Sequence, residues 1–369
     1  EGPPPAVVSS ARPAVGLDTV LGLVQGTTVG TIDADAPLMA SGLDSLGAVE
    51  LRNGLQAAMG EGVTLPSTLV FDYPTARQLA SFLGMQEDSS PKFGIRAVAA
   101  PSDGVAVTGM SALLPGGVND PAGAWRMSAG GCDVISEVPS SRWELGAQPA
   151  ASDAVGMRVR HGGFVAGAER FDHKAFGVSV AEAVAMDPQQ RLLLERGYEA
   201  LHGAGQRRAS LDGSTTGVAV GIYQTEFAHL LASGPHAKSV YAATGISLSI
   251  ASGRLSYVLG LQGPCFAVDT ACSASLVALH SAYRDVQKQE CDVYLAAGVN
   301  LTLLQSSSHR IALAGMSSAR GRSHTFDSRA DGFARGEGCC TVVLQQADAD
   351  GCRLEGIAVR QDGRSAILT

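Results

Sequence analysis

The chain has 369 residues, of which 45% are apolar and 17% charged, a composition that supports sizeable cores and excludes a disordered protein. Its 27 basic and 35 acidic residues give a net charge of −8, which argues against a binder of nucleic acid or of anionic membranes. No apolar run approaches the roughly 18 residues that span a bilayer. We therefore expect a soluble protein of the cytoplasm. The absence of an initiator Met suggests a piece of a longer polypeptide, which leaves an organelle open.

Charge and composition divide the chain into four segments. Residues 1–16 are rich in proline and are predicted to be a linker. The first 85 residues carry three basic and eight acidic side chains, so residues 17–85 are predicted to form a small acidic domain. Residues 86–103 lack periodicity and contain Ser, Pro and Gly, as linkers do. Residues 104–369 are nearly neutral and are predicted to form the larger domain.

The small acidic domain is predicted to be helical. An apolar stretch covers residues 17–24, and apolar side chains share one face of a helix predicted over residues 45–59 with Asp44 as its N-cap. An amphipathic helix is predicted over residues 75–83, where Pro74 is acceptable at the start. These helices predict a small helical bundle.

In the larger domain, short β-rich runs alternate with helical stretches, the pattern of an α/β fold. Strands are predicted at residues 105–109, 216–221, 265–269, 293–298 and 341–345. Helices are predicted at residues 188–204, 247–259, 273–287 and 305–314.

Ser45 lies in the run GLDSLGAVELR, at the first turn of the second predicted helix. A helix N-terminus favours an attached phosphate through its free N–H groups. No histidine precedes His161, so Ser45 lacks a general base and is a poor hydrolytic nucleophile. The local pattern thus indicates either a serine modified by another enzyme or a plain helix-start serine behind Asp44.

Cys272 lies in the run GPCFAVDTACSASLVA, where a strand predicted to be buried meets a long helix predicted to begin at Cys272. The helix N-terminus favours a thiolate, and backbone N–H groups at such a turn can hold an oxyanion. The alternative is a small buried residue at a strand-to-helix junction. That structural interpretation is preferred for the other six cysteines, which sit in apolar surroundings without the spacing of metal ligands; no metal site is predicted.

Residues 17–84 resemble the acyl carrier protein domain of modular polyketide synthases. The resemblance rests on residues 42–51, which match the attachment motif, and on residues 65–83, which match the family's last two helices. It implies an all-α four-helix carrier bundle and a 4′-phosphopantetheine arm on Ser45, added by a phosphopantetheinyl transferase. It also implies that an acidic surface beside the arm, with Asp44, Leu46 and Glu50, docks on partner domains.

From about residue 105 onward the chain resembles the β-ketoacyl synthases of the thiolase superfamily. The matching runs are AMDPQQRLLLE, DTACSASL, TFD through DG to RGEG, and QDGRS. The resemblance implies the N-terminal half of a layered αβαβα fold, with Cys272 as the acyl-accepting nucleophile. The family has Ser where this chain has Ala274. Its two catalytic histidines and a second oxyanion donor fall beyond the position of Thr369.

Other polar residues of these motifs are interpreted as structural. These are Asp187, Arg191, Asp331 and Glu337. The eight histidines of the chain lie outside the family's catalytic motifs and are interpreted as surface or structural residues.

The order carrier, linker, synthase is what we expect between two elongation steps. The resemblance implies an acyltransferase of β-ketoacyl synthase type: Cys272 takes the chain from a carrier, and the whole protein condenses it with a malonyl-type unit by decarboxylation. It implies a homodimer and contacts with acyltransferase and carrier domains. This fragment alone is expected to be inactive in condensation. The alternatives are a carrier or transfer module with a truncated or non-elongating synthase, and a related fatty-acid synthase.

Overall fold

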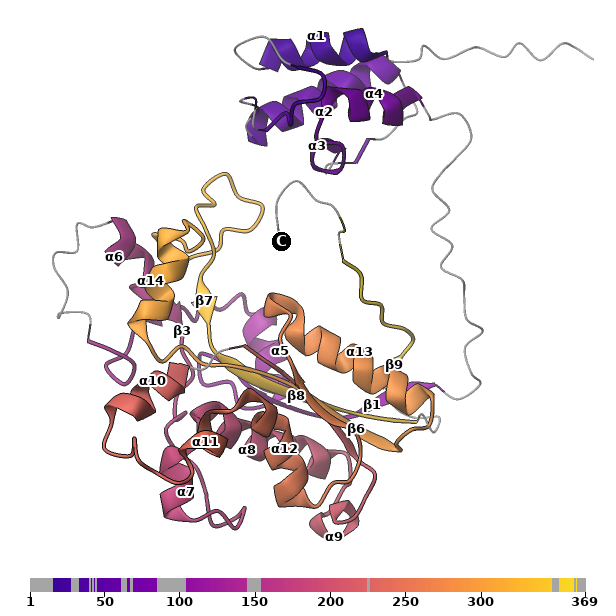
Figure 1. The fold of residues 1–369 in the computed structure, drawn as a ribbon. Coiled ribbons are helices and arrows are strands. Elements are labelled where there is room, and N and C mark those ends of the chain that lie inside the picture. The colour runs from indigo at the N-terminus through magenta and orange to yellow at the C-terminus, as the bar shows by residue number, and fades with distance from the viewer. Residues whose placement is uncertain are drawn as a thin grey trace, which may run out of the picture. The chain divides into compact units, whose positions relative to one another are not determined.

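In the computed structural model the chain folds into two units, one made of helices and one of the α/β type, and each is described by itself (Figure 1). The structure describes residues 16–27, 33–39, 41, 43, 45–60, 65–66, 69–84, 104–144, 154–223, 226–346, 352–361 and 363.

The first unit contains α1 (Leu17–Thr27), α2 (Ser45–Met59), α3 (Leu69–Asp72) and α4 (Ala76–Gly84). The helix predicted over residues 45–59 is confirmed with those bounds. Helix α1 runs three residues beyond its prediction, through Gly26, and α4 is displaced by one residue from its prediction. The N-cap assigned to Asp44 lies outside the described residues. One apolar core joins the helices, and its fully buried members include Val20, Val24, Leu51, Leu55, Leu69 and Leu79.

Arg52 ties α2 to the chain that leads into α3. Its Nε and Nη2 atoms donate to the carbonyl of Leu65 at 3.0 and 2.6 Å. A guanidinium presents both donors in one plane, so the pair of bonds fixes direction as well as distance. This contact orients the helix whose first residue is Ser45.

A mixed six-stranded sheet forms the centre of the second unit, in the order β5-β4-β6-β8-β1-β9. Strands β5, β4 and β6 are mutually parallel, and β8 pairs antiparallel with both β6 and β1. The bounds are β1 Val105–Leu113, β4 Gly217–Ile222, β5 Cys265–Val268, β6 Val293–Asn300, β8 Gly338–Gln346 and β9 Cys352–Leu354. All five predicted strands are therefore confirmed, although β1 and β8 extend well beyond their predictions.

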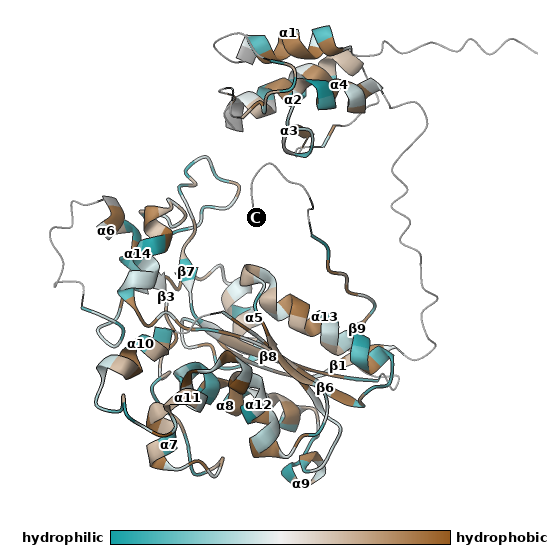
Figure 2. Cartoon of the chain, viewed as in Figure 1, coloured by the Kyte–Doolittle hydropathy of each residue, from teal (hydrophilic) through white to brown (hydrophobic). Residues whose placement is uncertain are grey.

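Helices cover both faces of this sheet (Figures 1 and 2). Successive side chains of a strand point to opposite faces, so each face of the sheet contributes to its own apolar core. Helices α8 (Pro188–Gly203) and α12 (Leu248–Leu259) pack on the face that carries Val218 and Leu295. Helix α13 (Ala274–Gln287) packs on the opposite face. Figure 2 shows the resulting apolar interior in brown along the sheet.

Several short elements lie around this frame. Helix α14 (Gln305–Leu313) was predicted, and the others were not; most of them are too short to show periodicity. A second sheet has the order β2-β3-β7. The unpredicted elements are α5 Pro121–Ala129, β2 Ser136–Glu137, α6 Ala154–Arg158, β3 His161–Gly163, α7 Val180–Ala185, α9 Arg208–Leu211, α10 Glu226–Ser233, α11 Ala242–Ile246 and β7 Arg335–Gly336.

A buried ion pair joins the turn that follows β2 to the residue between β7 and β8. Arg142 and Glu337 form two parallel bonds of 2.8 Å, and their side chains are 4% and 0% exposed. Arg142 also donates to the carbonyl of Val165 at 3.1 Å, while Glu337 accepts from the Val165 N–H at 3.0 Å. The hydrogen bonds that Arg142 donates to Glu337 raise the pKa of Arg142 above its usual value. The structural role predicted for Glu337 fits these contacts.

We predict that Glu337→Gln destabilises the second unit by about 3–5 kcal/mol, because it leaves the Arg142 charge buried without a counter-charge. Urea denaturation of the purified chain measures the loss. The matched control is Glu169→Gln, whose partner Arg170 is 87% exposed at 3.8 Å and which should cost at most about 1 kcal/mol. Equal small losses for both variants would contradict the role given to the buried pair.

Asp187 begins α8 as a buried cap. Its carboxylate accepts from the Gln189 N–H at 2.8 Å, and the residue is 4% exposed. Burial raises the pKa of Asp187 from 3.8 to about 6, against the hydrogen bonds from Gln189, which lower it. The folded chain therefore holds this proton more tightly than the unfolded chain does.

The contribution of Asp187 to the free energy of unfolding therefore rises as the pH falls from about 6 towards 4. We predict that Asp187→Asn, which keeps a capping oxygen, removes this rise and leaves a flatter profile across that window. Unfolding free energies measured at intervals between pH 4 and 7 test it. An unchanged slope in the variant would show that other groups dominate.

Candidate active site

The three parallel strands β5, β4 and β6 of the large sheet all end on the same side of it. Because β5, β4 and β6 are parallel, their carboxyl ends lie together, and the register pairs Val268 with Gly221 and Gly221 with Gly298. Ligands of parallel sheets bind at this edge, outside the carboxyl ends of the strands. Cys272 follows β5 here, and residues 301–304 follow β6.

Cys272 lies in a tight turn that a carboxylate stabilises. Ala271 has φ +53°, a conformation that an alanine rarely adopts, and its N–H donates to Asp269 Oδ1 at 2.8 Å. The hydroxyl of Ser273 donates to the carbonyl of Thr270 at 2.9 Å on the other side of the turn. The Cys272 residue is exposed. A strained, side-chain-braced turn thus presents a free thiol between a strand and a helix.

Two details of the predicted turn are wrong. Strand β5 is not buried: Cys265 is exposed and the residues up to Val268 are half-buried, because β5 is the edge strand of the sheet. Nor does Cys272 begin the long helix. It lies within a 3₁₀ turn, Ala271–Ser273, and α13 begins only at Ala274. The strand-to-helix junction itself is confirmed.

Two glycines form the support beneath this turn. A Cβ atom on Gly221 would lie 2.5 Å from the Ser275 nitrogen and 2.6 Å from the Ala274 carbonyl carbon. A Cβ atom on Gly298 would lie 2.6 Å from Ser275 Cβ. The first turn of α13 therefore rests directly on the ends of β4 and β6. Sequence reasoning missed both residues, although each ends a predicted strand.

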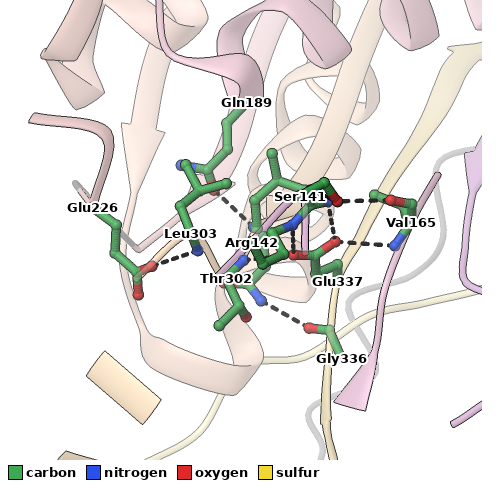
Figure 3. A network of polar contacts seen from close by, with 11 residues as sticks. Ser141, Arg142, Val165, Gln189, Glu226, Thr302, Leu303, Gly336 and Glu337 are labelled. Carbon is green, nitrogen blue, oxygen red and sulfur yellow. Dashed lines mark hydrogen bonds and ion pairs between the residues drawn. The ribbon is translucent and has the colours of Figure 1, made fainter. Parts of the chain in front are cut away.

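The segment after β6 is held by side chains from three distant elements (Figure 3). The N–H groups of residues 301–304 all donate to side-chain oxygens. Leu301 donates to Gln189 at 3.2 Å and Thr302 to Glu337 at 3.0 Å, while Leu303 and Leu304 both donate to Glu226 at 2.6 Å. Gln189, Glu226 and Glu337 are all at least 95% buried. We call residues 301–304 with these three acceptors the amide clamp.

The amide clamp was not predicted. Gln189 and Glu337 lie in runs that the resemblance quoted, and Glu337 was given a structural role, but Glu226 stands in no motif. Its one sequence signal is a carboxylate at the start of a short apolar stretch, which is also the signal of an ordinary helix start.

In the first unit, Ser45 is the first residue of α2, whose first turn contains no acidic residue. A hydroxyl at a helix N-terminus suits a phosphodiester, because the free N–H groups and the helix dipole favour its negative charge. This part of the chain therefore fits a phosphopantetheine arm. Of the predicted docking residues, Glu50 is exposed, while Asp44 and the side chain of Leu46 lie outside the described residues.

The remaining cysteines correct the sequence analysis in part. Cys291 and Cys339 are buried as predicted, and burial raises the pKa of Cys291 to about 11 and that of Cys339 further. The others are exposed, contrary to prediction: Cys132 lies in a loop, Cys265 and Cys352 begin the edge strands β5 and β9, and Cys340 lies in the central strand β8. All seven thiols are free. In the described part of the chain no cluster could hold a metal ion, and none of its helices is long and apolar enough to cross a bilayer.

Comparison with known families now identifies the class of both units. Residues 102–349 match the model of the β-ketoacyl synthase N-terminal domain, and residues 17–83 match that of the phosphopantetheine attachment site. The chain belongs to the β-ketoacyl synthase family, and its first unit is a carrier that holds 4′-phosphopantetheine covalently. Both resemblances inferred from the motifs are confirmed.

Its relatives are modular polyketide synthases. The chain is 42% identical to polyketide synthase GfsB of Streptomyces halstedii over 96% of its own length and 7% of that protein. It is also 42% identical to the pikromycin synthase component PikAII of Streptomyces venezuelae, over 92% of its length and 9% of that protein. The chain thus spans under a tenth of these relatives.

Solved ketosynthases share the fold of the second unit. A ketosynthase from the bacillaene synthase of Bacillus subtilis 168 has 33% sequence identity and a TM-score of 0.57, covering 66% of this chain and 40% of its own. The oxazolomycin ketosynthase domain OzmH KS7 of Streptomyces albus has 32% identity and a TM-score of 0.59, covering 66% and 42%. The thiolase-like fold predicted for this unit is therefore present.

We predict that Gly221→Ala displaces the first turn of α13 and destabilises the unit by about 1–3 kcal/mol, because the added Cβ meets backbone that cannot yield cheaply. Alkylation of Cys272, followed by peptide mass spectrometry, should change in rate relative to Cys132. The control, Gly253→Ala in α12, has open space and should stabilise by about 0.5–1 kcal/mol. A Gly221→Ala chain with native stability and native Cys272 reactivity would refute the support role.

Proposed function

We propose that this chain is part of a chain-elongating polyketide synthase, in which Ser45 carries the acyl group and Cys272 accepts it. The observation that carries the proposal is the exposed thiol of Cys272, on a braced turn at the carboxyl edge of a ketosynthase sheet. The carrier in the same chain supports it. The relatives are polyketide synthases, which favours this pathway over a fatty-acid synthase.

The acyl transfer at Cys272 is an exchange of one thioester for another. The phosphopantetheine arm supplies a thiol on which an acyl chain is held as a thioester. The sulfur of Cys272 attacks the carbonyl carbon of such a donor, the donor's carbon–sulfur bond breaks, and the donor thiol leaves with the proton. A backbone N–H of the turn stabilises the oxyanion. The exchange is nearly isoenergetic, so position and access decide its rate.

The condensation belongs to the full-length protein. The resemblance requires two histidines, and none of the eight in this chain lies in the corresponding motifs. We assign to the complete synthase the attack on a malonyl-type unit, in which loss of CO₂ leaves the carbanion that displaces Cys272 from the acyl carbon. The present chain alone carries out the transfer but not the carbon–carbon bond formation.

The carrier is proposed to be a four-helix bundle over residues 17–85, joined by a linker at 86–103 to the synthase from residue 104. Its partners would be a phosphopantetheinyl transferase, acyltransferase domains and neighbouring carriers. Asp44, Leu46 and Glu50 would form the docking surface around the arm, and the exposure of Glu50 supports this. We also propose a cytoplasmic homodimer. Among the described strands β5 has one neighbour only, which leaves an edge for a second copy.

One experiment tests both assigned residues. The chain is incubated with a phosphopantetheinyl transferase and labelled acyl-coenzyme A, and peptides are analysed by mass spectrometry. We expect one acyl-phosphopantetheine group on Ser45 and, later, an acyl group on Cys272. Ser45→Ala should abolish the first modification, and Cys272→Ala, which removes the acceptor thiol, should abolish the second.

Matched variants keep the test specific. Ser41→Ala removes a nearby serine hydroxyl that donates to the Pro37 carbonyl, and Cys132→Ala removes another exposed thiol. Both should leave both modifications unchanged. Modification that persists in Ser45→Ala would overturn the carrier assignment. If the acyl group were instead found equally on all exposed thiols, the result would show plain thiol reactivity and not an active site at Cys272.

A further inference from the structure

A small, partly open space lies beside the amide clamp in the second unit. Its volume is about 10 Å³, which corresponds to a single water-sized species. Trp143, His161 from β3 and Thr302 from the clamp line it, together with Arg158 and Arg335. These residues come from chain segments far apart in sequence, so the space is formed by the tertiary fold.

Three of the lining residues each carry a buried polar side-chain atom that has no hydrogen-bond partner among the described residues. These atoms are Nε1 of Trp143, Nδ1 of His161 and Oγ1 of Thr302. Thr302 is only 3% exposed, so bulk water does not reach its hydroxyl. An unpaired buried donor or acceptor is unfavourable, and folded proteins leave very few of them. Three residues with such atoms line one small space, which points to a shared ligand.

The chemistry of the lining restricts that ligand. An indole N–H only donates, so the ligand must accept a hydrogen bond, whereas a hydroxyl and a neutral imidazole can each donate or accept. Among the residues that the structure describes, no acidic side chain lines the space, which disfavours a cation. Arg158 is already directed at the carbonyls of Ser317 and Asp331, and Arg335 donates to Ser308 at 2.9 Å.

We propose that this space binds one structural water molecule. It accepts from the indole of Trp143 and exchanges hydrogen bonds with Thr302 and His161, which gives about three bonds, the usual number for a buried water. The Thr302 N–H is held by Glu337, and the water would hold the side chain of the same residue. The site thereby adds a second attachment for the segment that follows β6, independent of the acyl-transfer function proposed above.

The sign of a stability change tests the proposal. Thr302→Val keeps the shape of the side chain and removes the hydroxyl. With a bound water, the variant breaks a hydrogen bond and should lower the folding equilibrium constant about fivefold. With a dry space, it removes an unpaired buried hydroxyl, so stability should stay equal or increase. Thr302→Ser, which keeps the hydroxyl, should retain the bound water and serves as the rescue variant.

Thr108→Val is the matched control. The Thr108 hydroxyl is also buried and unpaired, but Thr108 does not line this space, so its loss should be neutral or stabilising. A direct measurement covers the case of poor folding: a crystal structure of the unsubstituted chain grown with sodium bromide. Density at hydrogen-bond distance from Thr302 and without anomalous signal supports the water. An anomalous bromide peak, or no density, overturns it.

Discussion

The backbone N–H groups of residues 301–304 impose the constraint on which the candidate site depends. This segment leaves the sheet with Leu301 and Thr302 still buried and the next two residues half-buried, where a donor without an acceptor is costly. Since neither strand nor helix accepts from these N–H groups, side chains must do so. Glu226 and Glu337 bring two carboxylates into the interior for this purpose. A buried carboxylate in turn needs a counter-charge, and Arg142 supplies one to Glu337.

The nucleophile turn depends on the opposite requirement, absence of side chains. Helix α13 can begin at Ala274 only because Gly221 and Gly298 leave room for its first turn on the sheet. Asp269 then braces the unfavourable φ of Ala271 with one hydrogen bond. The turn that carries the thiol is therefore supported by backbone packing beneath it, and Cys272 is exposed, which suits an acyl donor that must approach from solvent. The amide clamp holds the segment that follows β6. The nucleophile turn and the amide clamp together therefore shape the side of the sheet where the parallel strands end.

What the sequence could predict follows from the range of the interactions. The five strands, helix α2 and the strand-to-helix junction at Cys272 depend on local pattern, and each was found within a few residues. The exposure of β5 could not be predicted, because an apolar run reads alike in a central and an edge strand. Its place is set by strand order. Arg142 carried no local signal either, since its partner Glu337 lies 195 residues further along the chain.

The edge position of β5 links assembly to chemistry in the proposed function. The same short strand ends at the nucleophile turn and leaves one side without a neighbour among the described strands. Any chain that pairs with this edge would fix the strand along its length and, through Val268 and Asp269, stiffen the turn that follows. A synthase built this way would couple association to the placement of Cys272. The half-buried residues of β5 would then become an interior strand, which is how the sequence alone describes them.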